Sequence, residues 1–145
     1  MSKPEIDDLI NVVDQIDPTV LTAADKAEIK AWGADKVGFV AVNMDTQKIL
    51  FATSGAEVVF GYMPDEMVGL DLLALVPDEF KAVHPAHVAG FNASPTPRSM
   101  GKRDKPLRGR ERDGKTFEVE IGLFPRQFKS LRICLANVVR LAKEV

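Results

Sequence analysis

The sequence predicts an α+β domain in which a five-stranded antiparallel sheet carries a helical crossover on one face and a helical extension at its N-terminus. Three observations support this fold class. Apolar and polar residues alternate over 117–123, as in a strand with one buried face. The pair Asp113-Gly114 is typical of a tight hairpin turn. Within 55–69, two short apolar segments flank Gly61, and helices this short need a sheet to cover.

The N-terminal extension is predicted to cover residues 1–35, and the main domain 36–145. Apolar residues at helical spacing predict an amphipathic helix over 4–16, which ends before Pro18 because a residue preceding proline disfavours helical backbone. An apolar stripe outside the main sheet must be buried somewhere. We therefore expect the extension either to cap the chain's own sheet or to pair with the same helix of a second copy.

The remaining elements follow in order along the chain. Thr22 is predicted to cap a second helix that ends near Gly33. The helical crossover is expected over about 54–92, between the second and third strands. The five strands are predicted near 37–43, 47–52, 106–112, 115–124 and 130–141.

Length and composition limit the class of protein. The 145 residues correspond to one soluble domain. No apolar run approaches the roughly 20 residues needed to span a bilayer, and the polar first residues do not form a signal peptide. Cys134 is the only cysteine, which excludes an intrachain disulfide and a cysteine-based zinc site. We expect a cytoplasmic protein with no membrane association.

Charge is unevenly distributed although the net charge is only −2. Residues 1–35 hold three lysines against eight acidic residues, and residues 98–112 hold seven basic residues against two acidic ones. These regions could meet within one chain or across a dimer, or could remain two solvated faces. Arg108, Arg110 and Arg112 alternate along one predicted strand, but no aromatic residues are interleaved with them. We therefore expect no nucleic-acid binding.

Several segments together resemble the PAS domain family, from about Val37 to Leu141. The helical run contains Phe60-Gly61-Tyr62 and ends in an acidic turn at Gly69. The other segments that carry the resemblance are 37–45, 47–51, 75–77, 98–101 and 107–117. Within PAS domains the likeness is closest to the haem-binding, oxygen-sensing domains of rhizobial sensor kinases. The resemblance implies a PAS fold and a sensory role.

The resemblance also implies candidate haem ligands. His84 falls where the resembled oxygen sensors place the proximal haem ligand, and a neutral imidazole can bind haem iron. Pro85 disfavours helical backbone at His84, so His87 is the alternative. Arg98 or Arg103 could neutralise a haem propionate or approach a bound gas. The apolar residues expected to wall a haem b pocket are Val88, Phe91, Leu123, Ile133 and Leu135.

Flavin chemistry and enzymatic activity are not expected. The flavin-binding PAS variant carries an Asn-Cys-Arg run in its crossover, whereas Cys134 lies in the last predicted strand. The sequence holds no phosphate-binding glycine loop, nucleophile elbow or kinase signature. Ser54 is expected to cap a helix rather than act as a nucleophile. Glu57 and Glu66 are expected on solvated helix faces.

The predicted function is that of a sensory or signalling PAS module that binds a small ligand between sheet and helices. The chain stops shortly after its last predicted strand, without a coiled-coil exit or an output domain. We expect signalling through a homodimer formed by the N-terminal helices or through a separate signalling protein, unless the chain is a fragment of a longer protein. The alternative is a ligand-free PAS module for protein–protein interaction.

Overall fold

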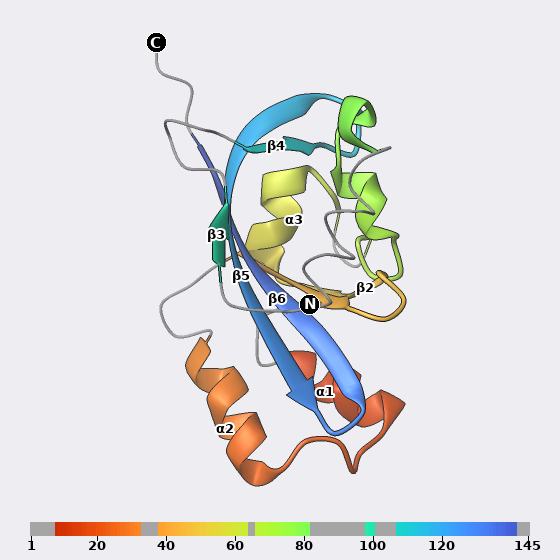
Figure 1. The fold of residues 1–145 in the computed structure, drawn as a ribbon, viewed down its shortest axis with the longest axis vertical. Helices are drawn as coiled ribbons and strands as arrows, with labels where there is room; N and C mark the ends of the chain where they lie inside the picture. The colour runs from red at the N-terminus through yellow and green to blue at the C-terminus, as the bar shows by residue number, and fades with distance from the viewer. Residues whose placement is uncertain (1–7, 33–37, 64–65, 82–97, 101–106, 142–145) are drawn as a thin grey trace.

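The fold is built on one antiparallel sheet, shown in Figure 1. It is described from a computed structural model that covers residues 8–32, 38–63, 66–81, 98–100 and 107–141. The strands are β1 (Phe39–Asn43), β2 (Ile49–Ala52), β3 (Arg98–Met100), β4 (Leu107–Arg110), β5 (Thr116–Phe128) and β6 (Leu131–Arg140). Their order is β2-β1-β6-β5, and both β3 and β4 pair with the remaining edge of β5.

The five predicted strands are confirmed as β1, β2, β4, β5 and β6. β3 is a strand that the sequence did not predict. Met100 of β3 pairs with Ile121, and Leu107 of β4 pairs with Val119, so only one β5 residue separates the two registers. Since β3 and β4 lie along the same edge of β5, they form two parts of one interrupted edge strand.

β5 is longer than predicted because it continues through Pro125 to Phe128. Proline has no N–H to donate across a ladder and is tolerated where one side of a strand has no neighbour. Pro125 lies beyond Leu123, the last β5 residue that pairs with β3. On its other side it pairs with Cys134 of β6. The missing N–H therefore leaves the described pairing of the sheet intact.

Two helices precede the sheet, and short helical segments follow β2. The helices are α1 (Asp8–Ile16), α2 (Ala23–Trp32) and α3 (Ser54–Phe60), and two 3₁₀ segments follow as η1 (Leu72–Leu75) and η2 (Asp78–Phe80). The predicted cap of α2 is confirmed. The Asp25 N–H donates to the Thr22 hydroxyl at 3.1 Å, and the Thr22 N–H donates to the Asp25 carboxylate at 2.9 Å.

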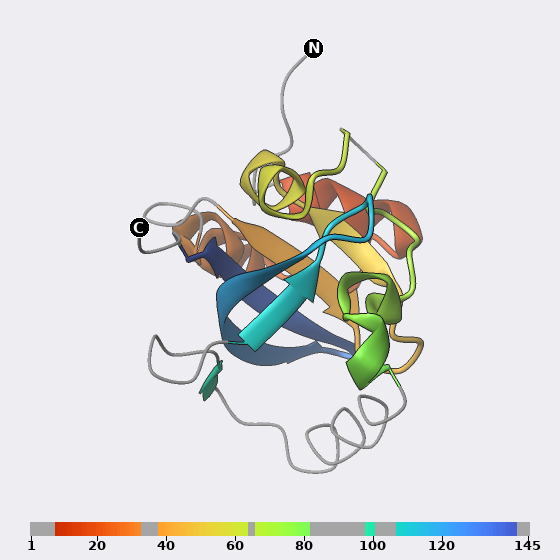
Figure 2. The ribbon, with the colours of Figure 1, turned by 90° about the horizontal axis from the view of Figure 1, so that it is seen from above.

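Each face of the sheet has its own apolar core. We call the face contacted by α1 and α2 the outer face, and the face contacted by α3 the inner face. The outer core contains Leu9, Ile10, Val13, Val20, Leu21, Ile29, Phe39, Ala41, Phe51, Phe128, Ile133 and Leu135. The inner core contains Val40, Val42, Ile49, Ala52, Ala56, Phe60, Met67, Leu75, Phe117, Val119 and Val138. Figure 2 shows α3 and the 3₁₀ segments beside the curved β5 and β6 strands.

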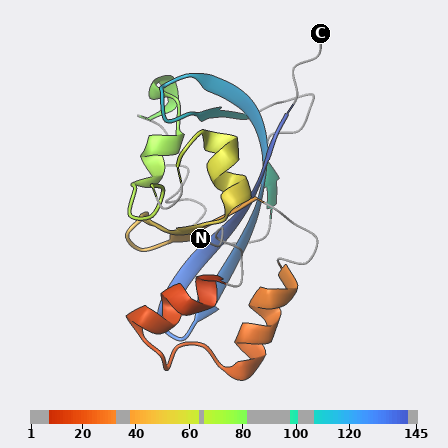
Figure 3. The same ribbon diagram turned by 180° about the vertical axis from the view of Figure 1, so that it is seen from behind.

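The N-terminal extension packs on the chain's own sheet, which is one of the two alternatives that its apolar stripe left open. Leu9, Ile10 and Val13 of α1 are buried in the outer core. Figure 3 shows α1 and α2 together at the end of the β5–β6 hairpin. Ile16, at the last position of α1, remains 58% exposed. In the single chain, α1 and α2 therefore form a cap on the outer face.

The acidic N-terminal extension and the basic 98–112 region form ion pairs with different parts of the domain. The arginines of β4 and the following turn form the pairs Arg108–Glu118 at 3.9 Å, Arg110–Asp78 at 3.9 Å and Arg112–Glu66 at 3.2 Å. The N-terminal cap forms the pairs Asp14–Lys26 at 3.2 Å and Glu28–Arg126 with β5. None of these pairs joins the acidic extension to the basic 98–112 region.

Truncating α1 on its buried side should destabilise the whole domain. Leu9 is 0% exposed, so Leu9→Ala removes packing from the outer core and should lower the free energy of unfolding by about 2–5 kcal/mol. Chemical denaturation measures this change. Ile16→Ala at the exposed C-terminal end of the same helix is the control and should change stability by less than about 0.5 kcal/mol. Equal effects of the two substitutions would show that α1 is not packed on the sheet.

Candidate functional site

α3 begins at a threonine that ties the helix to the sheet. The buried Thr53 hydroxyl accepts the N–H of Ala56 at 3.4 Å and the N–H of Phe39 in β1 at 2.9 Å. Thr53 is therefore the N-cap, and Ser54, which the sequence analysis proposed as a cap, is the first residue of the helix. The cap fixes the start of the crossover against the first strand of the sheet.

α3 ends where predicted, at a left-handed glycine. Gly61 has φ 74, and its N–H donates to the carbonyl of Val58 at 3.3 Å. The Tyr62 N–H donates to the carbonyl of Glu57 at 2.9 Å. These bonds satisfy the Glu57 and Val58 carbonyl groups at the end of α3. The left-handed backbone of Gly61 ends the helix.

The α3 end of the inner face is filled by aromatic packing. The rings of Phe60 and Phe117 meet edge to face, with centroids 5.4 Å apart. Gly109 of β4 lies against them, and a Cβ atom at this position would stand 2.9 Å from Phe117 Cζ and 3.2 Å from Phe60 Cε1. This half of the inner face is therefore a closed core rather than a ligand cavity.

The other half of the inner face carries uncharged side chains. Leu123 pairs with Ala136, and Ala136 pairs with Val40, which belongs to the inner core. By the same alternation Cys134 lies on this face, next to its partner Val42. We call Val42, Leu123, Cys134 and Ala136 the inner-face patch.

The thiol of the inner-face patch is neutral at physiological pH. Burial raises the pKa of the Cys134 thiol to about 11. A neutral thiol in the middle of a sheet strand lacks the thiolate character that makes a cysteine reactive. Cys134 therefore contributes an apolar surface to the patch rather than a nucleophile.

Two residues predicted to wall a pocket under the crossover lie on the wrong side of the sheet for that role. Ile133 and Leu135 are buried in the outer core, against the N-terminal cap. They alternate with Cys134 and Ala136 along β6, so they point away from the inner-face patch. Of the predicted wall residues in the described part of the chain, only Leu123 faces the crossover.

The other predicted site residues fall largely outside the described residues. These are His84, His87, Val88, Phe91 and Arg103. Arg98 belongs to β3, where its backbone pairs with Leu123 of the inner-face patch. The possible iron ligation by His84 or His87 thus remains a prediction from the sequence.

The prediction that Glu57 lies on a solvated helix face is wrong. Glu57 is only 4% exposed and is buried together with Ala56 and Phe60 of the same helix. Glu66 remains partly exposed, and its carboxylate accepts the Met63 N–H at 2.7 Å and pairs with Arg112 at 3.2 Å. Glu66 therefore joins the end of the α3 segment to the β4–β5 turn, whereas Glu57 is a buried residue of α3.

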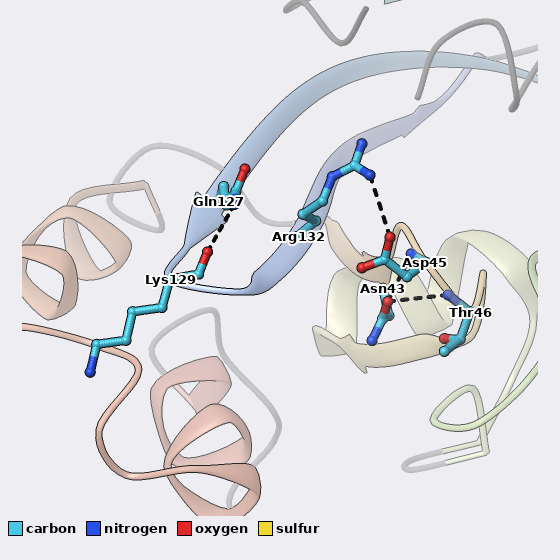
Figure 4. Close-up of polar contacts among 6 residues, drawn as sticks. All are labelled: Asn43, Asp45, Thr46, Gln127, Lys129 and Arg132. Atoms are coloured by element: carbon cyan, nitrogen blue, oxygen red, sulfur yellow. Dashed lines mark hydrogen bonds and ion pairs between the residues drawn. The ribbon is translucent and has the colours of Figure 1, made fainter. Parts of the chain in front are cut away.

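Polar contacts fix the loop after β1 and the β5–β6 turn, as Figure 4 shows. The Asn43 side-chain oxygen accepts the N–H groups of Asp45 at 2.9 Å and Thr46 at 3.2 Å. Arg132 of β6 donates to the Asp45 carboxylate at 3.4 Å, and the Gln127 amide donates to the Lys129 carbonyl at 2.9 Å. Arg132, the arginine of β6 nearest to Cys134 in the sequence, is thus already paired with Asp45.

Among the described residues, a shallow hollow of about 350 Å³ lies beside the α3 cap, lined by Gly61, Glu111, Arg112 and Asp113. Within the described ranges, no three histidine, cysteine or acidic side chains come together as a metal site. In the same part of the chain, no helix is both long enough and apolar enough to cross a membrane. The inner-face patch is the better candidate for a small-molecule site, because it is apolar and lies on the crossover side.

The solved structures that resemble this chain share one fold, whereas searches by sequence find no match. No family model matches the sequence, and no curated protein matches it either. A light-oxygen-voltage domain from a study of a flavin analogue superposes with a TM-score of 0.65 at 17% identity, covering 84% of this chain and 90% of that one. A PAS domain from Desulfitobacterium hafniense gives 0.61 at 15% identity, covering 74% and 95%. The PAS-B domain of Drosophila melanogaster Cycle with bound ethylene glycol gives 0.57 at 17% identity, covering 72% and 99%.

These similarities show that the chain has the PAS fold, as the sequence predicted. They do not bear on the narrower likeness to haem-binding PAS domains. They also do not support the expectation that flavin is unlikely, because light-oxygen-voltage domains are among the similar structures.

The closed half of the inner face predicts a strong response to a single added methyl group. Gly109→Ala places a Cβ against Phe117 and Phe60 and should lower the free energy of unfolding by about 1–3 kcal/mol. Gly122→Ala in β5 is the control, since its Cβ would make only ordinary contacts, with the Phe124 ring at 3.4 Å and with Asn137 Cβ at 4.0 Å. Urea denaturation of both variants measures the difference. A Gly109→Ala variant as stable as Gly122→Ala would mean that the Phe60 and Phe117 rings do not close this region.

The raised pKa of Cys134 predicts slow thiol chemistry in the folded chain. With a pKa of about 11, the folded thiol at pH 8 should carry roughly 100-fold less thiolate than the unfolded chain. Its rate of reaction with an aromatic disulfide should keep rising between pH 8 and pH 10, whereas the rate in urea should level off near pH 9. Stopped-flow absorbance measures both rates. Cys134→Ser is the blank, and equal rates with and without urea would contradict the buried, neutral thiol.

Proposed function

We propose that this chain is a sensory PAS module that binds a small, flat, largely apolar ligand on the inner-face patch and signals through contacts with a partner chain. One observation carries the proposal. Along β5 and β6, patch residues are followed directly by residues that belong to the outer core or pack against it. Leu123 is followed by Phe124, and Cys134 by Leu135. A ligand that displaces these strands on the inner face therefore also displaces the packing beneath the N-terminal cap.

The chemistry of the patch supports a ligand of this class. Val42, Leu123, Cys134 and Ala136 are uncharged, and the thiol among them is neutral. Ala136 and Cys134 are small, so they leave the centre of this face flat. Arg132, which follows on the same side of β6, is paired with Asp45. Hydrophobic contact rather than charge pairing would therefore supply most of the binding free energy.

The signalling side of the proposal rests on the cap. α1 and α2 cover the outer face through an apolar core, and Glu28 of α2 pairs with Arg126 of β5. A shift of β5 changes the surface on which both helices sit. A homodimer formed by the N-terminal helices, or a separate signalling protein docked on them, would read that change. This is a binding and signalling role, without catalysis by the chain itself.

Haem b and flavin are the two candidate cofactors for the inner-face patch. For haem, His84 or His87 would supply the iron ligand, and Arg98 or Arg103 would face a propionate. When bound, haem supplies an iron that takes up a diatomic gas, and the patch would contact one face of the macrocycle. For flavin, the reason is the similarity in fold to a light-oxygen-voltage domain that was studied with a flavin analogue. In either case Cys134 would serve as an apolar contact.

Reconstitution with each cofactor decides between them. The purified chain is mixed separately with haem b and with flavin mononucleotide, and binding is followed by the Soret band and by flavin fluorescence. A Soret band that His84→Ala or His87→Ala shifts or abolishes would establish a haem sensor. Bound flavin mononucleotide would establish a flavin module. If neither binds, native mass spectrometry of protein purified from its source shows whether another small molecule is retained.

Substitution on β6 tests whether binding occurs on the inner-face patch. Ala136→Phe adds a ring to the patch and should weaken binding of whichever cofactor is taken up by at least roughly tenfold. Val139→Phe lies on the opposite face of the same strand, where Val139 is 49% exposed, and should leave binding unchanged. Titration by absorbance or fluorescence measures both affinities. Equal losses in the two variants would place the ligand elsewhere.

A ligand-free interaction module is the second candidate function. The edge-to-face packing of Phe60 and Phe117 favours it, because half of the inner face is already filled by the chain itself. This candidate requires that protein from its source carries no small molecule and forms a stable dimer. Native mass spectrometry reports both properties in one measurement.

A further inference from the structure

The end of α3 depends on two other elements for its hydrogen bonds. A helix leaves its last four carbonyl groups without partners in the helix. Two of them are bonded within the Gly61 cap described above. The Phe60 carbonyl accepts the N–H of Arg112 in the β4–β5 turn at 3.0 Å. The Val59 carbonyl accepts from the guanidinium of Arg140, the last residue of β6, at 3.4 Å.

Arg140 also contacts the hairpin on which that turn is built. Its guanidinium pairs with the Glu111 carboxylate and lies 4.4 Å from the centroid of the Phe117 ring. A positive charge beside the carbonyl end of a helix is favoured by the helix dipole. One side chain at the end of β6 thus joins the crossover helix, the β4–β5 turn and the aromatic core.

The next residue belongs to the sheet ladder. The Leu141 N–H donates to the Glu118 carbonyl of β5 at 3.0 Å, immediately after Arg140. Movement of the Arg140 backbone therefore acts directly on this hydrogen bond.

We propose that Arg140 is a positioning residue that couples the C-terminal end of α3 to the end of β6, so that displacement of α3 loosens the Leu141–Glu118 hydrogen bond. In the sensory role proposed above, a displacement of α3 would thereby alter the C-terminal end of β6. The coupling itself needs no ligand, so it can be measured whether or not the proposed function is correct.

A strained α3 cap tests the coupling. Gly61→Ala leaves room for the new methyl group, whose nearest neighbour is Glu111 Cβ at 3.9 Å, but φ 74 is unfavourable for alanine. Amide hydrogen exchange at Leu141 is then followed by NMR. In the chain with Arg140, Gly61→Ala should speed this exchange about fivefold. In the Arg140→Gln background, where Leu141 is already loosened, Gly61→Ala should add less than about twofold.

Arg132→Gln is the matched control, because Arg132 lies on the same strand but pairs with Asp45 at the opposite end. The effect of Gly61→Ala on Leu141 should persist in that background. If Arg140→Gln does not fold, Glu111→Gln replaces it, and should reduce the Gly61→Ala effect by weakening the hold on the guanidinium. The inference is overturned if Gly61→Ala leaves Leu141 exchange unchanged, or if it acts equally with and without the intact Arg140 contacts.

Discussion

The structure depends on the need to bury both faces of the central strands. β1, β5 and β6 carry apolar side chains at successive positions, so neither face can be left in water without loss of hydrophobic stabilisation. The chain covers the inner face with the helical crossover and the outer face with α1 and α2. α1 is therefore a layer of the domain, since it buries Leu9, Ile10 and Val13 on the sheet.

Sequence patterns located elements whose signals are local. The Thr22 cap, the Gly61 cap and the Asp113-Gly114 turn were predicted, because each depends on residues within a few positions of one another. The turn forms with Gly114 at φ 95 and with the Lys115 N–H donating to the Asp113 carboxylate at 3.0 Å. The three-residue β3 was missed because it is too short to show a period, and it exists only through its pairing with β5.

The candidate site was harder to predict because it depends on which face a side chain occupies. In β6, residues 133–135 are all apolar and buried, so no alternation of polar and apolar residues distinguishes the two faces of this strand. Ile133 and Leu135 were assigned to the crossover side although they pack under the cap. Glu57 was placed in water because carboxylates are usually exposed, yet it is buried in α3. The face that each side chain occupies is set by which strands pair and in which register. A single sequence does not reveal that pairing.

The interrupted edge strand has a consequence for how this fold can vary. β3 and β4 are each fixed to β5 by their own register, and a single β5 residue separates the two paired segments. Neither register depends on how many residues join them, and lengthening a connection between fixed ends adds only a slowly growing entropic term. Relatives can therefore differ in length here while keeping the same sheet.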